Sequence, residues 1–577
     1  MINAELARVF SQMADLMEIK GADRFRINAY RTAARSIMDC LEDVAELAGQ
    51  GKLQKIPGIG KGTAAKVEEY LANGCIAAHL ELLASYPAGL RQLMDVRGLG
   101  PRKIEVLYRE LKVGCLEDLK AAIADGRVAG LKGFGEKTAK NILEALEFLD
   151  RAHERTPLGI AAPLAAQLRE AVAAMPNVRR VEIAGSLRRG RDTVADIDLL
   201  CVADNGPQVI ATFTKLPRVS SVLAAGDTKG SCVVETLKGG GIQADLRVVP
   251  AESFGAAMQY FTGSKEHNVR LREMAVRRGW RLNEYGLLEG ESRIAGEDEV
   301  GIYSALGLPF IPPELREDRG EFDRPEGWPD LIRREDMVAE LHLHTTASDG
   351  RLELEEMVEA CRALGYRHMA VTDHSKSSVI ANGLSVDRLL AQMETIRKLN
   401  RRLKDFTILV GTECDVLPNG RLDFPDEVLA QLDWVVASVH AGQRGERAAQ
   451  TRRTIAAIEN PYVCAIGHPS GRLIGRREPM DLDFEQIIAA AARTGTALEV
   501  NSSWHRLDLK DQHVRQAVEA GCWLTINTDA HSASDLQQMG YGIQTARRGW
   551  AARPRVLNTL SVEELRRWVH GKRRRTM

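Results

Sequence analysis

The sequence predicts a chain of several domains with three architectures in succession: an all-helical N-terminal region, an α+β central domain and a C-terminal α/β barrel. Short amphipathic helices separated by glycine turns fill residues 4 to about 150, and strands alternate with helical stretches from about 155 to 316. Beyond residue 333, short apolar strands that end in polar residues recur between helices. A chain of 577 residues is long enough for about two to four domains.

The composition excludes some classes of protein. The formal net charge is −1 and the sequence pI is about 6.9, so the chain is not a uniformly basic nucleic-acid coat, and any DNA-binding surface must come from local basic patches. The nine cysteines include no Cys-x-x-Cys pair, which predicts reduced thiols rather than a disulfide framework. No apolar run approaches the ~18 residues that a membrane helix needs. We therefore expect a soluble, cytoplasmic monomer with no membrane partner.

Three similar glycine turns organise the helical region. A Gly-hydrophobic-Gly sequence precedes a helix with Lys or Arg near its start in IPGIGKGTAAKVEEYL (56–71), VRGLGPRKIEVLYREL (96–111) and LKGFGEKTAKNILEAL (131–146). Glycine lets the backbone approach closely, and amides at the following helix N-terminus can bind a phosphate oxygen. The turns resemble helix-hairpin-helix motifs, which hold a DNA backbone without reading its sequence. The third turn either binds phosphate or only packs two helices. We assign DNA contacts to the glycines of the first two turns: Gly58, Gly60, Gly98 and Gly100.

Three carboxylates indicate a metal site in the central domain. Asp196 and Asp198 lie two residues apart in AGSLRRGRDTVADIDLL (184–200), so a strand would point both to one face, where they could hold two divalent cations. Asp245, in IQADLRVVP, is flanked by apolar residues, and a bound metal would compensate the burial of its charge.

A glycine-serine turn precedes these carboxylates. Gly185 and Ser186 stand just ahead of Arg188 and Arg189. Together they offer backbone amides, a hydroxyl and guanidinium groups, a combination that suits a triphosphate.

This arrangement resembles the nucleotidyltransferase superfamily, and YFTGSKEHN (260–268) narrows the resemblance to family X DNA polymerases, similar to DNA polymerase beta, over about residues 1 to 316. The resemblance implies that Asp196, Asp198 and Asp245 bind two Mg²⁺ ions and that Asp245 also helps to deprotonate the primer 3′-hydroxyl. It implies that Ser186 and Arg189 hold the incoming triphosphate, that Tyr260 and Phe261 lie against the sugar, that Asn268 reaches the base edge and that Arg272 contacts the templating side. Gly185 and Gly263 complete the nucleotide-binding residues that the resemblance implies.

Two positions depart from the family pattern. Lys265 follows YFTGS, where the eukaryotic members have an acid. Lys66 occupies the place of the Schiff-base lysine that removes a 5′-deoxyribose phosphate, but Gly62 stands where the family often has a lysine. Lys66 is therefore either a lyase nucleophile or a phosphate-facing or solvated lysine.

Polar residues gather at the strand ends of the C-terminal region. His342 and His344 alternate on one strand and so share a face. Because the carboxyl ends of parallel strands meet at one rim of a barrel, imidazoles and acids placed there converge. Mixed imidazole and carboxylate ligands without cysteine favour Zn²⁺ or Mn²⁺ in a multinuclear hydrolytic centre. The candidate ligands are His342, His344, Asp349, His374, Glu413, His440, His468, Asp529 and His531.

These motifs resemble the polymerase and histidinol phosphatase (PHP) domain, a distorted seven-stranded α/β barrel with a trinuclear metal site. In that family the domain gives bacterial family X polymerases a 3′-to-5′ exonuclease, sometimes with activity at abasic sites or 3′-phosphates. Beside the ligands, we expect Asp373 to orient a ligand and Arg472 to face either a substrate phosphate or solvent. Three other histidines of the C-terminal region are expected to lie at the surface or to pack in the interior: His368, His505 and His513.

The sequence therefore predicts a DNA repair enzyme, in which a template-directed, gap-filling polymerase is fused to a metal-dependent 3′-to-5′ exonuclease. Its expected partners are gapped or primer-template DNA and dNTPs. Two alternatives are a phosphoesterase whose front half only holds DNA, and a scaffold that recruits repair proteins to gaps. The predicted divisions are a helical domain at 1–85, a helical DNA-binding subdomain at 86–155, the palm and thumb at 156–316, a linker at 317–332 and the PHP domain at 333–577.

Overall fold

The computed structural model describes residues 2–40, 44–56, 58–87, 89–90, 93, 96, 99–131, 133–136, 138–140, 142–143, 146, 155–236, 240–328 and 330–576. The chain divides into two compact units, Met1–Glu154 and Arg155–Met577. In the described part of the chain, no helix is both long and apolar enough to cross a membrane.

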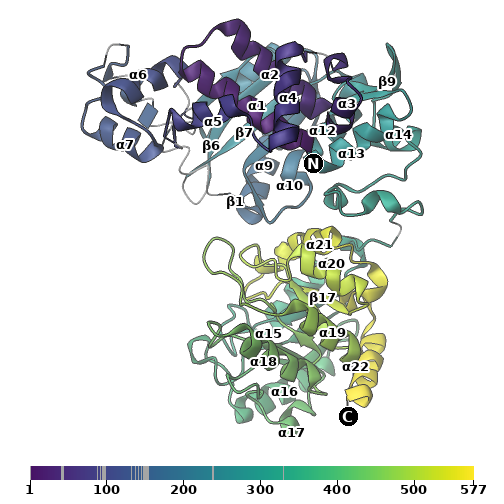
Figure 1. Ribbon diagram of the computed structural model, residues 1–577. Helices are drawn as coiled ribbons and strands as arrows, with labels where there is room; N and C mark the ends of the chain where they lie inside the picture. The colour runs from purple at the N-terminus through teal and green to yellow at the C-terminus, as the bar shows by residue number, and fades with distance from the viewer. Residues whose placement is uncertain are drawn as a thin grey trace. The chain divides into compact units, whose positions relative to one another are not determined.

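The first unit is helical and contains two apolar clusters (Figure 1). On α1, Leu6, Phe10 and Met13 follow the three-to-four-residue spacing that places them on one buried face. The Asp23 side chain caps α2 by accepting from the amides of Phe25 and Arg26. The helices of this unit are α1 (Ile2–Ile19), α2 (Arg24–Asp39), α3 (Val44–Gly49), α4 (Lys61–Asn73), α5 (Ala77–Ala84), α6 (Pro101–Leu111) and α7 (Leu116–Ala124).

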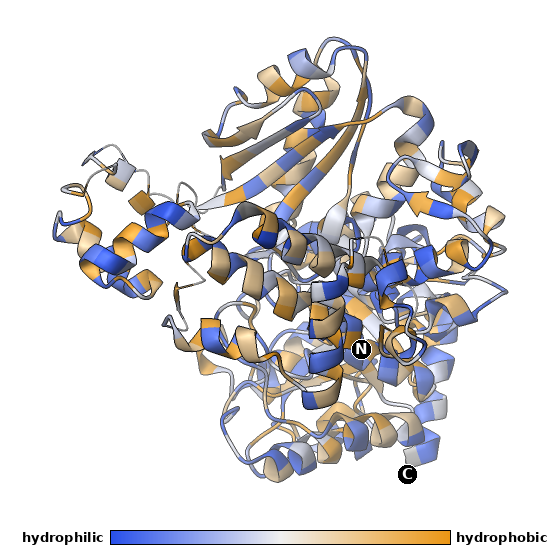
Figure 2. Ribbon diagram, turned by 45° about the horizontal axis from the view of Figure 1, so that its top comes forward, coloured by the Kyte–Doolittle hydropathy of each residue, from blue (hydrophilic) through white to orange (hydrophobic). Residues whose placement is uncertain are grey.

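The second unit begins with a five-stranded sheet in the order β2-β4-β7-β6-β5. Only the β4–β7 pair is parallel, and it aligns Asp198 with Asp245. The long strands alternate between hydrophobic and hydrophilic residues (Figure 2), as a sheet with one buried face requires. The strands and helices of this palm are β1 (Thr156–Pro157), α9 (Leu158–Ala173), β2 (Val178–Ile183), α10 (Gly185–Arg188), β3 (Thr193–Val194), β4 (Asp196–Ala203), α11 (Gly206–Phe213), β5 (Val219–Ala225), β6 (Lys229–Glu235) and β7 (Gly241–Val248).

A smaller α/β segment, the thumb, follows the palm. A buried hydrogen-bond chain organises it: His267 Nδ1 lies 2.7 Å from Glu321 Oε1, and His267 Nε2 lies 2.8 Å from the Tyr303 hydroxyl. Glu321 belongs to the stretch predicted as a linker, and its side chain is fully buried. The elements of the thumb are α12 (Phe254–Thr262), α13 (Lys265–Val276), β8 (Arg281–Asn283), β9 (Gly286–Glu289), β10 (Ser292–Ala295) and α14 (Glu299–Ala305).

Seven parallel strands form the C-terminal barrel in sequence order, β11 to β17. A parallel bridge between Leu343 and Ala530 joins its two ends. The strands are β11 (Ala339–Leu343), β12 (His368–Val371), β13 (Thr407–Asp415), β14 (Trp434–Ser438), β15 (Ala465–Ile466), β16 (Ala497–Asn501) and β17 (Leu524–Asn527).

Helices surround the barrel (Figure 1). They are α15 (Leu354–Ala363), α16 (Val386–Asn400), α17 (Asp426–Leu429), α18 (Arg447–Glu459), α19 (Phe484–Thr494), α20 (Asp511–Glu519), α21 (Met539–Arg548) and α22 (Val562–Thr576). Trp568 of α22 packs 6.1 Å from Trp434 between ring centroids, so the last helix belongs to the barrel core. The predicted fold class, helical front region, α+β palm with thumb and seven-stranded barrel, is confirmed.

Candidate functional site: a carboxylate palm and a histidine-lined barrel

The glycine turns of the first unit are built for close approach. Gly58 has a φ of +83°, and a Cβ there would lie 2.4 Å from Thr32 Cγ2, so no other residue fits. Gly60 and Gly100 precede α4 and α6, whose N-termini receive no side-chain cap; because α6 begins with Pro101, its first free amide is that of Arg102. Two helix N-termini with open amides are suited to DNA phosphates. Gly98 lies outside the described residues, and Lys66 lies half-buried on α4.

The palm brings the three predicted carboxylates onto neighbouring strands. Asp196 and Asp198 lie on β4, and Asp245 lies opposite Asp198 on β7. Asp245 is buried, and its Oδ2 lies 2.7 Å from Lys229 Nζ on β6. Sequence reasoning missed Lys229, because its position opposite Asp245 depends on strand order.

The clustered negative charges of this site favour bound cations. Burial, together with the charges of Asp196 and Asp245, raises the pKa of Asp198 to about 7, and burial with the charge of Asp245 raises that of Asp196. Burial also acts on Asp245, but hydrogen bonds from Lys229, Ser231 and Gln243 bring its pKa below the usual value. Clustered carboxylates that repel each other's charge fit divalent ions.

Gly185 must be glycine because it lies against a carboxylate. Its φ is +66°, and a Cβ would lie 2.3 Å from Asp198 Oδ2. The half-buried Ser186 follows at the first turn of α10, so the predicted triphosphate turn and the carboxylates form one site.

Arg188 and Arg189 have internal partners in this structure. Arg188 donates to Thr262 Oγ1 at 2.7 Å and pairs with Glu299 at 2.6 Å. Arg189 lies 3.1 Å from Glu317 and donates to the Thr262 carbonyl, and its carbonyl accepts from Arg548 of α21 at 2.8 Å. Gly263 packs on Arg189, since a Cβ there would lie 3.1 Å from Arg189 Nη1. The Nε and Nη1 groups of Arg189 thus have protein partners in this structure.

The junction of α12 and α13 positions the remaining nucleotide-site candidates. Tyr260 and Phe261 contact each other edge to face, with ring centroids 5.1 Å apart. Asn268 accepts from Gln259 Nε2 and donates to the Tyr260 carbonyl, both at 2.7 Å. Arg272 Nε donates to the Asn268 carbonyl at 3.3 Å. Asn268 therefore fixes the end of α12.

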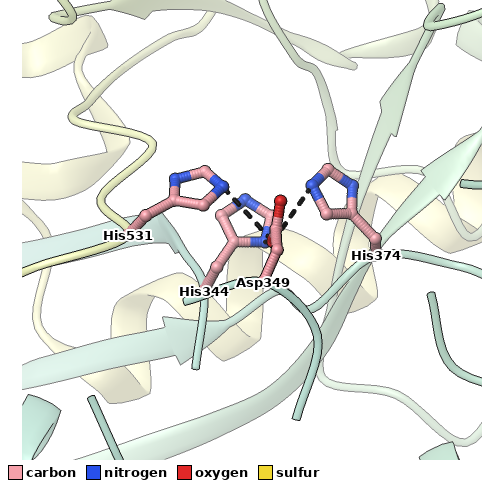
Figure 3. A group of neighbouring side chains, drawn as sticks. All are labelled: His344, Asp349, His374 and His531. Atoms are coloured by element: carbon pink, nitrogen blue, oxygen red, sulfur yellow. Dashed lines mark ion pairs between the residues drawn. The ribbon is translucent and has the colours of Figure 1, made fainter. Parts of the chain in front are cut away.

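The barrel brings predicted ligands together in three groups that share members. Within each group, the ligand atoms lie within 4.8 Å of one another. Figure 3 shows one of them, in which His344, His374 and His531 surround Asp349. The His531 Nε2 to Asp349 Oδ1 distance is 3.3 Å, and the His374 Nε2 distance to the same oxygen is 3.6 Å. The groups are His344, Asp349, His374 and His531; His342, His344 and Asp529; and His374, Glu413 and His440.

Glu413 lies at the centre of the cluster. Its carboxylate lies 2.9 Å from His374 Nδ1, 2.9 Å from His468 Nε2 and 3.4 Å from His440 Nε2. His468 belongs to none of the three groups but reaches the cluster through this contact. The side chain is fully buried, yet the surrounding imidazoles hold the pKa of Glu413 well below its usual range against the effect of burial.

Orphaned atoms show that this donor set fits metal ions. Among the described residues, His342 Nε2 and His344 Nδ1 are buried without a hydrogen-bond partner, and His374 Nδ1 and Glu413 Oε2 lie 2.9 Å apart without forming a hydrogen bond. Burial of unpaired polar atoms is costly, and here they face one another. Imidazole nitrogens and carboxylate oxygens so arranged are typical of a multinuclear divalent site.

Two carboxylates that sequence reasoning missed orient the ligands. Glu499 on β16 accepts from His342 Nδ1 at 2.8 Å, and Asp415 on β13 accepts from His440 Nδ1 at 2.5 Å. Such bonds fix the ring and raise the basicity of the ligand nitrogen. A signal was present for each: Asp415 shares a face with Glu413 two residues earlier, and β16 was the one predicted strand without a ligand.

Asp373 supports a candidate ligand, whereas Arg472 lies in neither of its expected environments. Asp373 accepts from the amide and hydroxyl of Thr345, at 2.8 and 2.6 Å, and from the hydroxyl of Ser348, which lies 3.3 Å from Asp349 Oδ1. It therefore reaches Asp349 through Ser348, as the expected orienting role requires. Arg472 donates to the carbonyls of Arg506 and Leu507 and pairs with Asp192 of the palm at 3.0 Å, so it faces neither open solvent nor the metal cluster.

Arg506 takes the place that Arg472 was expected to fill. It lines a pocket of about 580 Å³ together with six of the candidate ligands, its Nε lies 3.7 Å from Asp529 Oδ2, and its buried Nη1 has no partner. The histidines expected to pack do so: His368 is buried at the opposite end of β12, His505 stacks on Trp504 and His513 on Phe484.

Four family models match the chain. They are described as a helix-hairpin-helix domain at residues 1–76, a SAM-like helix-hairpin-helix tandem at 90–147, a DNA polymerase beta thumb at 257–317 and a PHP domain at 340–503. The matches cover the same regions in which the sequence motifs and the structure place the glycine turns, the thumb and the barrel.

Characterised proteins resemble the chain over different extents. DNA polymerase lambda of Rattus norvegicus is 25% identical over 55% of the chain and 56% of that protein. A protein named "Probable phosphatase" of Caldicellulosiruptor bescii is 29% identical over 35% of the chain and 82% of that protein. DNA polymerase/3′-5′ exonuclease PolX of Bacillus subtilis (strain 168) is 39% identical over 97% of the chain and 98% of that protein. The chain therefore belongs to the PolX family, in which a family X DNA polymerase carries a C-terminal PHP domain.

Proposed function

We propose that this protein is a template-directed DNA polymerase that fills short gaps during DNA repair, and that its barrel is a metal-dependent 3′-to-5′ exonuclease. The observation that carries the proposal is the presence of two complete and separate sites in one chain: three carboxylates beside a glycine-serine turn in the palm, and nine clustered ligands in the barrel. Gapped or primer-template DNA and dNTPs are the expected substrates, and the open helix N-termini of the first unit would hold the DNA backbone.

In the palm, Asp196, Asp198 and Asp245 would hold two Mg²⁺ ions, which when bound would neutralise the carboxylates and polarise the α-phosphate. By the family resemblance, Asp245 is the carboxylate that would accept the proton of the primer 3′-hydroxyl, and Lys229, whose Nζ lies 2.7 Å from its Oδ2, holds it in position. The hydroxyl oxygen then attacks the α-phosphorus, and pyrophosphate leaves. Gly185 and Ser186 would orient the triphosphate through the backbone and the hydroxyl.

In the barrel, the imidazole and carboxylate set would hold Zn²⁺ or Mn²⁺, which when bound supplies a water of lowered pKa and a clamp for a phosphodiester. Arg506 lies in the same pocket with a free buried N–H, which would donate to a phosphate oxygen. Hydrolysis of the last phosphodiester would release a nucleoside monophosphate and leave a new 3′-hydroxyl.

One labelled substrate tests both activities. A 5′-labelled primer on a one-nucleotide gap is incubated with Mn²⁺, with and without dNTPs. We expect extension with dNTPs and shortening without them. Asp196→Ala with Asp198→Ala should lose only extension, and His342→Ala with His344→Ala should lose only shortening. Extension that survives the palm variant, or shortening that survives the barrel variant, would contradict the assignment of that site.

A second activity of the barrel is the removal of a 3′-phosphate. The similarity of the chain to a protein named a probable phosphatase favours it, and a hydrolytic metal centre can cleave monoesters as well as diesters. A 3′-phosphorylated primer should then become extendable by the wild-type protein but not by the His342→Ala, His344→Ala variant. If neither the wild-type protein nor the variant extends the 3′-phosphorylated primer, this activity is excluded.

A further inference from the structure

Two aliphatic side chains stand almost fully exposed at the mouth of the barrel pocket. Val379 is 79% exposed and Ile380 is fully exposed, and both belong to the short 3₁₀ turn Val379–Ala381. They line the same pocket of about 580 Å³ as the candidate ligands His374, Glu413 and His440. Other apolar residues continue this wall: Ala381, Val416, Leu417 and Pro418. The pocket therefore joins a charged floor to an apolar rim.

The turn is held firmly, so this exposure is built into the structure. The Ser377 amide donates to Asp423 at 2.7 Å, and the Ser378 hydroxyl donates to Asp415 at 2.8 Å. On the other side, Asn382 donates to the Ser348 carbonyl at 3.2 Å. Asp415 is also the carboxylate that accepts from His440 Nδ1, so one side chain fixes both the apolar turn and a candidate metal ligand.

A phosphate group gives no reason for an aliphatic rim. A metal centre and a free guanidinium N–H satisfy a phosphodiester, whereas exposed Val and Ile gain free energy only by covering an apolar face. A pocket of about 580 Å³ lies in the size class of small-molecule sites and is large for a phosphate alone. In a DNA end, the apolar face next to the scissile phosphodiester is that of the terminal base.

We propose that Val379 and Ile380 contact the base of the 3′-terminal nucleotide and thereby hold its phosphodiester over the barrel site. The inference rests on the proposed exonuclease function and adds a determinant of its substrate: a 3′-terminal nucleotide that carries a base, presented out of its stack. The pair are positioning residues, because neither offers a group that reacts.

The test removes either side of this contact. The variant Val379→Ser with Ile380→Ser is compared with the wild type, and Val276→Ser with Val300→Ser serves as the control, because those side chains are also exposed, at 43% and 54%, but lie in the thumb. Two substrates are used with Mn²⁺: a 5′-labelled single strand, and the same strand ending in an abasic tetrahydrofuran nucleotide.

We expect kcat/KM on the normal end to fall by about tenfold or more in the rim variant, the size expected for losing the burial of an aliphatic side chain against the base. The abasic strand should be cleaved equally by the rim variant, the control and the wild type. Ile380→Leu, which keeps an aliphatic side chain, should retain wild-type cleavage of the normal end.

Two results would overturn the inference: wild-type cleavage of the normal end by the rim variant, or an equal loss on the normal and the abasic strand, which would make the turn a structural support of the site. Failure of the exonuclease proposal itself is distinguishable, because the wild-type protein would then shorten neither strand.

Discussion

Replacing Glu499 by glutamine tests whether the barrel is a metal centre oriented by a buried carboxylate. Glu499 is fully buried and accepts from His342 Nδ1 at 2.8 Å, from the His468 amide at 2.6 Å and from Asn527 Nδ2 at 2.9 Å. Burial raises its pKa, but the charges of His342 and His468 bring it below the usual value, so the group is anionic. Glutamine keeps the shape, removes the charge and turns one acceptor into a donor that faces another donor.

The expected loss follows from these contacts. A hydrogen bond to a charged group contributes about 1.5–3 kcal/mol. Removal of such a partner behind a metal ligand typically lowers metal affinity or activity by about 10–100-fold. At about 1.36 kcal/mol per tenfold change, the two estimates agree. Glu499→Gln should therefore lose bound metal and 3′-end shortening by this factor, while primer extension at the palm stays at the wild-type rate.

The matched control is Glu340→Gln. Glu340 is equally buried and stands two residues before His342, but it accepts from the Thr528 hydroxyl and from the backbone amides of Thr528 and His342 rather than from an imidazole. Burial raises its pKa to about 8, so the amide replaces a largely neutral acid. Metal content is measured by inductively coupled plasma mass spectrometry after dialysis, and shortening on a labelled strand. Wild-type metal content in Glu499→Gln, or an equal loss in Glu340→Gln, would refute the reasoning.

Other perturbations test the palm, the thumb and the bound metals. Gly185→Ala should abolish primer extension and spare 3′-end shortening, because its Cβ would lie 2.3 Å from Asp198 Oδ2; extension at the wild-type rate would contradict this packing. Burial lowers the pKa of His267 to about 4, so the thumb should be fully stable above pH ~6.5 and lose about 3 kcal/mol as the pH falls to about 4. Hydrogen exchange across residues 257–317 measures the stability of the thumb, and protection factors that do not change between pH ~6.5 and 4 would exclude this role of His267. Chelation by EDTA should lower the melting temperature, since a metal at a thousand times its Kd stabilises by about 4 kcal/mol; an unchanged calorimetric transition would argue against bound metal.

The sequence alone determined the fold class and the outline of both sites. Strand alternation places Asp196 with Asp198, and His342 with His344, on shared faces, because side chains in a strand repeat every second residue. Parallel strands bring their carboxyl ends to one rim, so histidines and acids at most of the strand ends predict convergence without knowledge of the packing. Glycine between hydrophobic residues likewise predicted the tight turn at Gly58, because the requirement is local.

Only the tertiary structure decided which groups support these sites. Lys229 reaches Asp245 because β6 lies beside β7, Glu499 reaches His342 across 157 residues of chain, and Arg472 is drawn away from the barrel site by Asp192 of the palm. The proposed role of Val379 and Ile380 follows only from the pocket that they line. The ligands follow the two-residue repeat of a strand and the positions of strand ends, and both can be read from the sequence. Their partners are chosen by burial and by the matching of charges between distant segments, and these are settled only when the chain packs.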